Sequence, residues 1–206
     1  MSAEREAEPV DHAAERTLVL GTRNSHKVRE VARLLAPAGI TVVPLPEGIE
    51  LPPETGDTFE ANALPKARTA AAATGQPAIA DDSGIEAEAL GGAPGVRSAR
   101  YAGPGANDER NLEKLIREAP PGSGLRYVCA LASVDPARRE ERVFFGYCQG
   151  RMAPARRGSG GFGYDPVFLP DEIGDGRTMA ELSDAEKDAI SHRGRAVRAC
   201  LDWLGP

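Results

Sequence analysis

Residues 17–43 read TLVLGTRNSHKVREVARLLAPAGITVV, and this stretch sets the expected fold class. Its first five residues, 17–21, form a short apolar run that predicts a buried strand. Apolar side chains then recur at helical spacing and predict a helix over 26–36, which a proline and a glycine end. A second apolar run at 40–43 predicts another strand. A strand, a loop, a helix and a strand in this order indicate an α/β architecture.

The middle of the chain continues the alternation. Residues 57–60 have the spacing of a capping box and predict the start of a long helix that runs to about residue 74. Residues 77–80 are predicted as a strand that delivers Asp81 and Asp82 to its carboxyl end. We therefore expect both carboxylates at the edge of the sheet where ligands bind in open α/β folds.

The C-terminal half is predicted to hold one helix at 107–118 and a hairpin. Two apolar segments, 125–134 and 141–150, are separated by a turn-like linker and predict an antiparallel pair of strands. Residues 183–186 have the spacing of a second capping box, and an apolar stripe near the C-terminus predicts a last helix.

Composition limits the class of protein. A chain of 206 residues suits one large domain or two lobes that share a core, and 41% hydrophobic residues fit an ordinary soluble protein. The formal charge of −6 argues against broad nucleic-acid binding but permits a small anionic ligand in a local basic pocket. We expect residues 1–16, which are acidic and lack an apolar core, to be a disordered tail, and residues 17–206 to be the domain.

The cysteines and the apolar runs point to the cytoplasm. Cys129, Cys148 and Cys200 lie far apart and predict neither a zinc site nor a disulfide framework, so reduced thiols in the cytosol are the simplest interpretation. No apolar run approaches the ~18 residues of a membrane span, so we expect no membrane partner.

Residues 21–27 lead a predicted strand into a helix N-terminus, where free N–H groups and the helix dipole favour an anion. Thr22, Asn24 and Ser25 add donors, and Lys27 adds a charge. Taken alone, this segment is better explained as an ordinary helix cap with a solvated lysine.

Adjacent aspartates repel each other unless a cation or solvent relieves them. Asp81 and Asp82 therefore suit Mg²⁺, which prefers oxygen ligands, although a turn with two solvated carboxylates is the alternative. Glu54 would be a further ligand or an ordinary surface residue. Asn62 and Lys66 are four residues apart on the predicted helix and share one face.

Residues 159–165, SGGFGYD, combine glycines that permit close backbone approach with an aromatic ring and a carboxylate. Phe162 would stack on a base, or would pack into the core. Asp165 would accept a hydrogen bond from a base or support the loop. Lys187, His192 and Arg193 lie near a junction of two helical segments and, taken singly, are ordinary surface residues.

Together these segments resemble the inosine triphosphate pyrophosphatase family, whose members act on noncanonical purine nucleotides. The resemblance runs from about residue 17 to 204 and rests on six motifs in order. They are TRNSHK (22–27), ETGDTF (54–59) with NA (62–63) and KA (66–67), ADDSG (80–84), GGAPG (91–95) with SARY (98–101), GGFGYDP (160–166), and EK (186–187) with SHRG (191–194).

The resemblance implies a twisted mixed sheet flanked by helices, in two lobes with a central cleft. It also implies a Mg²⁺-dependent homodimer that hydrolyses ITP, dITP and XTP to the monophosphate and pyrophosphate. Carried over by position, Glu54 and Asp82 serve the metal, and Asp82 is also the catalytic proton acceptor. The phosphates are held by Thr22, Arg23, Asn24, Ser25, His26, Lys27 and Lys66. The nucleotide contacts are Ser83, Phe162, Gly163, Tyr164, Asp165, Lys187, His192 and Arg193.

One position departs from the family pattern, and two other functions compete with this one. The family often has Glu directly before the asparagine of its TFxENA segment, whereas this chain has Ala61. A Maf-like pyrophosphatase for pyrimidine or modified nucleotides is the second hypothesis, and the FGYD and SHR segments argue against it. A non-enzymatic nucleic-acid-binding module is the third, and the negative charge argues against it.

Overall fold

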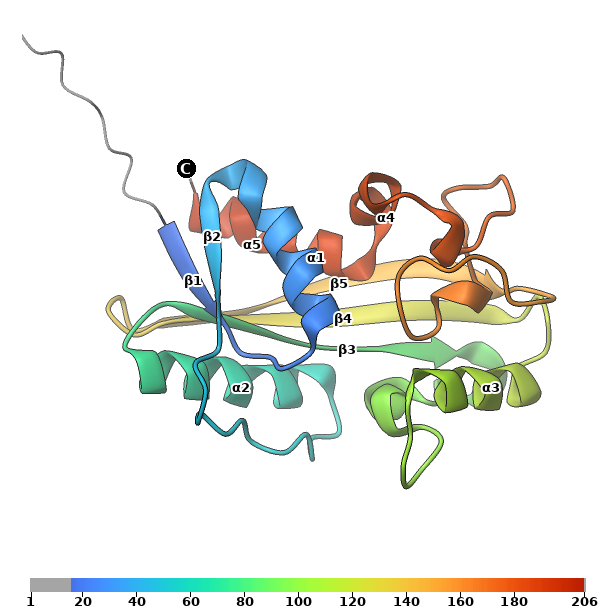
Figure 1. The fold of residues 1–206 in the computed structure, drawn as a ribbon, viewed down its shortest axis with the longest axis horizontal. Helices are drawn as coiled ribbons and strands as arrows, with labels where there is room; N and C mark the ends of the chain where they lie inside the picture. The colour runs from blue at the N-terminus through green and yellow to red at the C-terminus, as the bar shows by residue number, and fades with distance from the viewer. Residues whose placement is uncertain (1–15, 206) are drawn as a thin grey trace, which may run out of the picture.

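The computed structural model describes residues 16–205, and its centre is a six-stranded sheet in the order β2-β1-β3-β4-β5-β6 (Figure 1). The strands are β1 (Arg16–Leu20), β2 (Ile40–Pro44), β3 (Ala78–Ala87), β4 (Gly124–Asp135), β5 (Glu140–Met152) and β6 (Phe168–Pro170). The pairs β1–β2 and β1–β3 are parallel, and the remaining pairs are antiparallel. The predicted α/β class with a mixed sheet is therefore confirmed.

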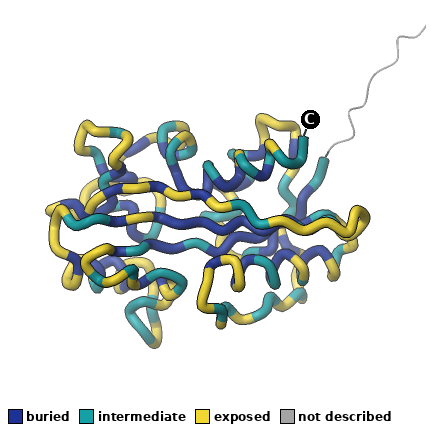
Figure 2. The backbone as a smooth tube through the Cα atoms, turned by 180° about the vertical axis from the view of Figure 1, so that it is seen from behind, coloured by how far each residue is buried: buried dark blue, intermediate teal, exposed yellow. Residues whose placement is uncertain are grey.

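Helices cover both faces of this sheet. The helices α2 and α3 lie on one face, and α1, α4 and α5 lie on the other (Figure 1). Their bounds are α1 (Ser25–Leu35), α2 (Phe59–Thr74), α3 (Asp108–Glu118), α4 (Asp184–Ile190) and α5 (His192–Leu204). Short 3₁₀ helices lie at Ala36–Ala38, Glu88–Leu90, Gly95–Arg100, Asp165–Val167 and Met179–Glu181. The central strands are consequently buried along most of their length (Figure 2).

The opening β1-α1-β2 unit forms within one residue of its predicted bounds. Asn24 caps α1, because its side-chain oxygen accepts hydrogen bonds from the amides of His26 (2.9 Å) and Lys27 (3.3 Å). Val31 and Leu35 are fully buried in one apolar cluster with Leu20 of β1. Helical periodicity therefore predicted which face of α1 packs on the sheet.

Strand β3 differs from its prediction in length. Asp81 and Asp82 lie in the middle of a ten-residue strand rather than at its carboxyl end. The parallel pairing with β1 stops at Ile79, opposite Leu20, but the antiparallel pairing with β4 continues to Ala87. The carboxylates therefore lie just beyond the end of β1, in the part of β3 that continues to pair with β4.

The start of α2 corrects a second prediction. Thr58, not Asp57, is the cap, and its hydroxyl oxygen accepts a hydrogen bond from the Ala61 amide at 3.1 Å. A glutamate at position 61 would stand where a capping box places its acidic residue. The departure at Ala61 therefore affects the helix start.

Residues 1–15 of the predicted tail lie outside the described residues. Arg16, its last residue, begins β1, and its guanidinium donates to the carbonyls of Gly205 (2.6 Å) and Leu204 (2.9 Å). Within residues 16–205, no helix has both the length and the apolarity needed to cross a membrane.

Candidate active site

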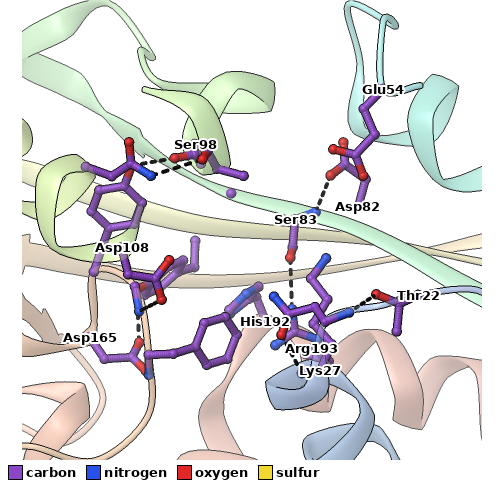
Figure 3. A pocket seen from close by; sticks show the side chains of 18 of the residues that line it. Thr22, Lys27, Glu54, Asp82, Ser83, Ser98, Asp108, Asp165, His192 and Arg193 are labelled. Carbon is purple, nitrogen blue, oxygen red and sulfur yellow. Dashed lines mark hydrogen bonds between the residues drawn. The ribbon is translucent and has the colours of Figure 1, made fainter. Parts of the chain in front are cut away.

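One cavity collects most of the residues that the sequence singled out, from segments far apart in the chain (Figure 3). Its lining includes Thr22, Asn24, Lys27, Glu54, Lys66, Asp82, Ser83, Phe162, Gly163, Tyr164, Asp165, Lys187, His192 and Arg193. The cavity lies beyond the carboxyl end of β1, between that strand's loop, the middle of β3 and the glycine-rich loop after β5.

Three residues of the predicted phosphate loop lie elsewhere. The Arg23 side chain donates to the carbonyls of Leu45 (2.7 Å) and Ile49 (2.9 Å), so it holds the loop after β2 rather than the cavity. Ser25 is exposed in the first turn of α1. His26 borders a shallower groove next to the cavity, and its ring centroid lies 5.0 Å from that of Phe162. The local pattern did not reveal which side chains turn inward.

Two carboxylates meet at one end of the cavity. Asp82 accepts hydrogen bonds from Asn62 Nδ2 (2.8 Å) and from the Ser83 amide (3.0 Å), which fix the orientation of its carboxylate. Glu54 is paired with Lys66, whose Nζ lies 2.5 Å from Oε1. Lys66 also donates to the carbonyl of Asp81 at 2.7 Å, so the loop, α2 and β3 converge at this ammonium group.

The electrostatics at this end suit a divalent cation. Burial, and then repulsion from Glu54, raise the pKa of Asp82 above its usual value. Within residues 16–205, no group of three or more His, Cys, Asp or Glu side chains converges as a metal cage. Mg²⁺ is commonly held by one or two carboxylates together with substrate phosphates, and Glu54 with Asp82 is such a donor set.

Asp81 does not join this pair, which corrects the prediction that it is a metal ligand. Neighbouring residues of a strand face opposite sides of the sheet, so Asp81 points away from Asp82. Its Oδ2 lies 3.0 Å from Lys27 Nζ and 3.0 Å from Arg193 Nη2. Burial alone would raise the pKa of Asp81, but these two cations hold it far below its usual value. Asp81 is thus a buried anchor for two cationic side chains.

Glu30 of α1 is a site residue that the sequence did not reveal. It is buried and bridges two predicted nucleotide contacts, since Oε1 lies 2.7 Å from Lys187 Nζ and Oε2 binds Arg193. Although burial opposes its ionisation, Arg193 and Lys187 hold the pKa of Glu30 below its usual value. The only feature of the sequence that could have indicated Glu30 was its position about one helical turn after Lys27.

The glycine-rich loop forms the aromatic end of the cavity. Asp165 accepts hydrogen bonds from Tyr127 (2.9 Å), the Phe162 amide (3.0 Å) and Lys187 (2.7 Å), so its carboxylate supports the loop. Gly161 has φ of +68°, and a Cβ there would lie 2.0 Å from Asp165 Oδ2. Only glycine fits this position, which explains one of the predicted glycines.

Phe162 is flanked by cations. Lys187 Nζ lies 5.1 Å from its ring centroid, and the Arg193 guanidinium carbon lies 5.7 Å away. Tyr164 is buried instead, and its hydroxyl donates to the carbonyl of Ser98 at 2.7 Å. Of the two loop aromatics, Phe162 is therefore the less buried ring that lines the cavity.

Tyr127 of β4 lines the cavity, and the sequence did not reveal it. Its ring stacks on His192 with centroids 4.6 Å apart and planes 6° apart. Burial, and then the nearby charges of Arg193 and Lys187, lower the pKa of His192 well below its usual value. The imidazole is therefore neutral at physiological pH, and its Nδ1 has no hydrogen-bond partner within the described residues.

A protein-family model described as the Ham1 family matches residues 18–203. The chain belongs to the Ham1 family. A relative from Symbiobacterium thermophilum, named dITP/XTP pyrophosphatase, is 50% identical over 194 residues, 93% of this chain and 96% of the relative. A Yersinia pestis protein of the same name is 49% identical over 193 residues, 91% of this chain and 97% of that protein.

Solved Ham1 structures share the fold. The Ham1 protein from Coxiella burnetii aligns with a TM-score of 0.80 and 38% identity, covering 92% of this chain and 98% of that one. A structure from Mycobacterium abscessus, described as a nucleoside-triphosphatase / dITP/XTP pyrophosphatase, aligns with a TM-score of 0.68 and 42% identity, covering 92% and 100%. The predicted flanked mixed sheet is therefore the Ham1 fold.

Proposed function

We propose that this protein hydrolyses noncanonical purine nucleoside triphosphates, namely ITP, dITP and XTP, to the monophosphate and pyrophosphate with Mg²⁺. One observation carries the proposal: a single cavity holds the Glu54–Asp82 carboxylate pair at one end and the Phe162 ring at the other. The names of the relatives, dITP/XTP pyrophosphatase, support dITP and XTP among these substrates. A bound nucleotide would place its phosphates at the first end and its base at the second.

The phosphate end combines cations with helix donors. Lys27 and Lys66 both line the cavity, and Thr22 and Asn24 border it at the N-terminus of α1. A triphosphate carries several negative charges, which these lysines and the helix dipole would offset. Glu54 and Asp82 would hold Mg²⁺, which when bound neutralises phosphate charge and polarises the scissile anhydride.

Asp82 is the proposed general base. Its two oxygens are fixed by Asn62 and Ser83, while the carboxylate still faces the cavity. It would take a proton from the water that attacks the phosphorus next to the α–β bridge, and pyrophosphate would leave. A carboxylate held within hydrogen-bond reach of the attacking water can take its proton as a general base.

Selectivity for the base would come from donors at the aromatic end. A guanidinium has five N–H groups, and in Arg193 four are directed at Asp81, Ser83 and Glu30. The remaining Nη1 hydrogen would donate to the 6-carbonyl of hypoxanthine or xanthine. Adenine carries an amino group at position 6. Neither this group nor the Arg193 N–H would then find an acceptor, so ATP would be rejected.

We also propose that the protein is a cytoplasmic homodimer, as the family resemblance implies. Phe145 and Tyr147 of β5 are exposed, and their rings stack at 6.3 Å. Packing of a second copy of this chain against β5 would bury these two rings away from water. Light scattering should give a dimer mass for the wild type and a monomer mass for the double variant Phe145→Glu, Tyr147→Glu, and a monomeric wild type would refute the dimer.

Product analysis tests the proposed reaction. Purified protein with Mg²⁺ should release pyrophosphate, not orthophosphate, from ITP, dITP and XTP, and should act far more slowly on ATP. Equal rates on ATP would contradict the base selectivity. Preference for UTP or dTTP would favour a Maf-like enzyme, and salt-sensitive duplex binding without hydrolysis would favour a nucleic-acid-binding module.

A further inference from the structure

The first turn of α3 is joined to the glycine-rich loop by a hydrogen bond. The Gly163 amide donates to Asp108 Oδ2 at 3.1 Å, between residues 55 positions apart. Asp108 also lines the cavity, and its side chain lies beside the loop in Figure 3. Helix α3 lies on the α2 side of the sheet, whereas Lys187, which anchors the loop through Asp165, belongs to α4 on the other side.

Two consecutive amides of the loop are held by two different carboxylates. Asp165 accepts from the Phe162 amide and Asp108 accepts from the next one, Gly163. The Cα of Phe162 lies between these two amide nitrogens, and its ring lies at the aromatic end of the cavity. The two acceptors together therefore set the direction in which that ring points.

The two carboxylates differ in how firmly they hold the loop. Asp165 is 3% exposed and receives three hydrogen bonds, including one from Lys187. Asp108 is exposed and holds the loop through the Gly163 amide alone. Gly163 has φ of +61°, and a Cβ on it would meet no atom within 4 Å, so no packing contact holds the residue from that side. The hydrogen bond from the Gly163 amide to Asp108 is consequently the contact that holds this part of the loop against the cavity.

We propose that Asp108 is a positioning residue for the nucleobase: it holds the Gly163 peptide so that Phe162 stays closed over the aromatic end of the cavity. The proposal rests on the proposed function for its kinetic effect, but the Asp108–Gly163 contact itself is independent of any reaction. Loss of the contact should loosen the loop, weaken substrate binding and leave the carboxylate end of the cavity intact.

Three variants separate the hydrogen bond from charge. Asp108→Ala removes the acceptor, whereas Asp108→Asn keeps an acceptor oxygen without the charge. Glu109→Gln is the matched control, because it removes a neighbouring charge from the same helix turn without contacting Gly163, and its exposed pair with Arg156 contributes little. Hydrogen–deuterium exchange of a peptide covering 160–165, in the substrate-free protein, reads the contact directly.

Asp108→Ala should speed exchange in this peptide and raise KM for ITP by about 2- to 13-fold, the usual effect of one ordinary hydrogen bond, with kcat changed far less. Asp108→Asn should restore both values, and Glu109→Gln should match the wild type. The proposal is overturned if Asp108→Ala leaves exchange or KM unchanged, or if Asp108→Asn behaves like Ala. A wild type inactive on ITP would refute the proposed function, while the exchange data would still judge the contact.

Discussion

Arg193 Nη2 lies 3.0 Å from Asp81 Oδ2, and both side chains are almost completely excluded from solvent. The same guanidinium donates to Ser83 Oγ at 2.8 Å, so the pair joins α5 to β3 at the wall of the cavity. Lys27 approaches the same carboxylate oxygen. One buried aspartate thus positions two cations that line the cavity.

Replacing Asp81 by Ala should destabilise the protein strongly. Removing one partner of a buried pair leaves Lys27 without its carboxylate and Arg193 with Glu30 as its remaining anionic partner, and such a loss typically costs about 3–5 kcal/mol of unfolding free energy. Urea denaturation measures the difference. The control is Glu141→Gln, which breaks an exposed pair with Arg68 and should cost at most about 1 kcal/mol. Equal effects of the two variants would show that burial does not govern the Asp81 contacts.

Replacing Asp82 by Asn should remove turnover without unfolding the protein. The amide keeps the size of the carboxylate but cannot accept the proton, so kcat on ITP should fall by about 10²- to 10⁴-fold. Circular dichroism and the urea midpoint check the fold. Glu60→Gln, an exposed change in the first turn of α2, is the control and should leave kcat at its wild-type value. Near-normal activity of Asp82→Asn would refute the general-base assignment.

Metal removal and the variant Glu54→Gln should together test whether Glu54 binds Mg²⁺. EDTA should abolish ITP hydrolysis, and Mg²⁺ should restore it. Glu54→Gln should require more Mg²⁺ for half-maximal activity, because one of the two carboxylates is lost. A titration of activity against Mg²⁺ gives this value for both proteins. An unchanged Mg²⁺ requirement would show that Glu54 serves only to pair with Lys66.

The stability of the protein should fall as pH falls below about 6.5, the usual pKa of a histidine. His192 is buried and its pKa is well below that value, so between the two pKa values the unfolded chain binds a proton that the folded chain does not. Unfolding free energy should then drop by up to about 1.4 kcal/mol per pH unit. His192→Gln should flatten this slope between about pH 6.5 and 5.5. Parallel pH profiles for both proteins would contradict the assignment.

The three cysteines should be unreactive in the native protein. Burial raises the pKa values of Cys129, Cys148 and Cys200 to about 12, so only about one thiol in 10⁴ is ionised near pH 8. Ellman's reagent should detect almost no thiol until the protein is unfolded in guanidinium chloride, and three thiols afterwards. Rapid native labelling would mean that the strands carrying these residues open readily.

The sequence predicted the helices and strands well where local rules decide. The apolar spacing of α1 and the hairpin of β4 and β5 formed as expected. The errors arose where a distant partner decided the outcome. Strand β3 continues through Asp81 and Asp82 because β4 pairs with it, and no feature within 77–80 indicated that partner.

By itself, the sequence determined which chemical groups the site contains and in which order their segments follow, because caps, periodicity and glycine turns depend on residues a few positions apart. The tertiary structure alone decided which groups face one another. Alternation along β3 turned Asp82 into the cavity and Asp81 into the core, and packing of α1 and α5 brought Glu30 to Arg193 across 163 positions. Such pairings depend on burial and on the meeting of distant elements, which no local pattern encodes.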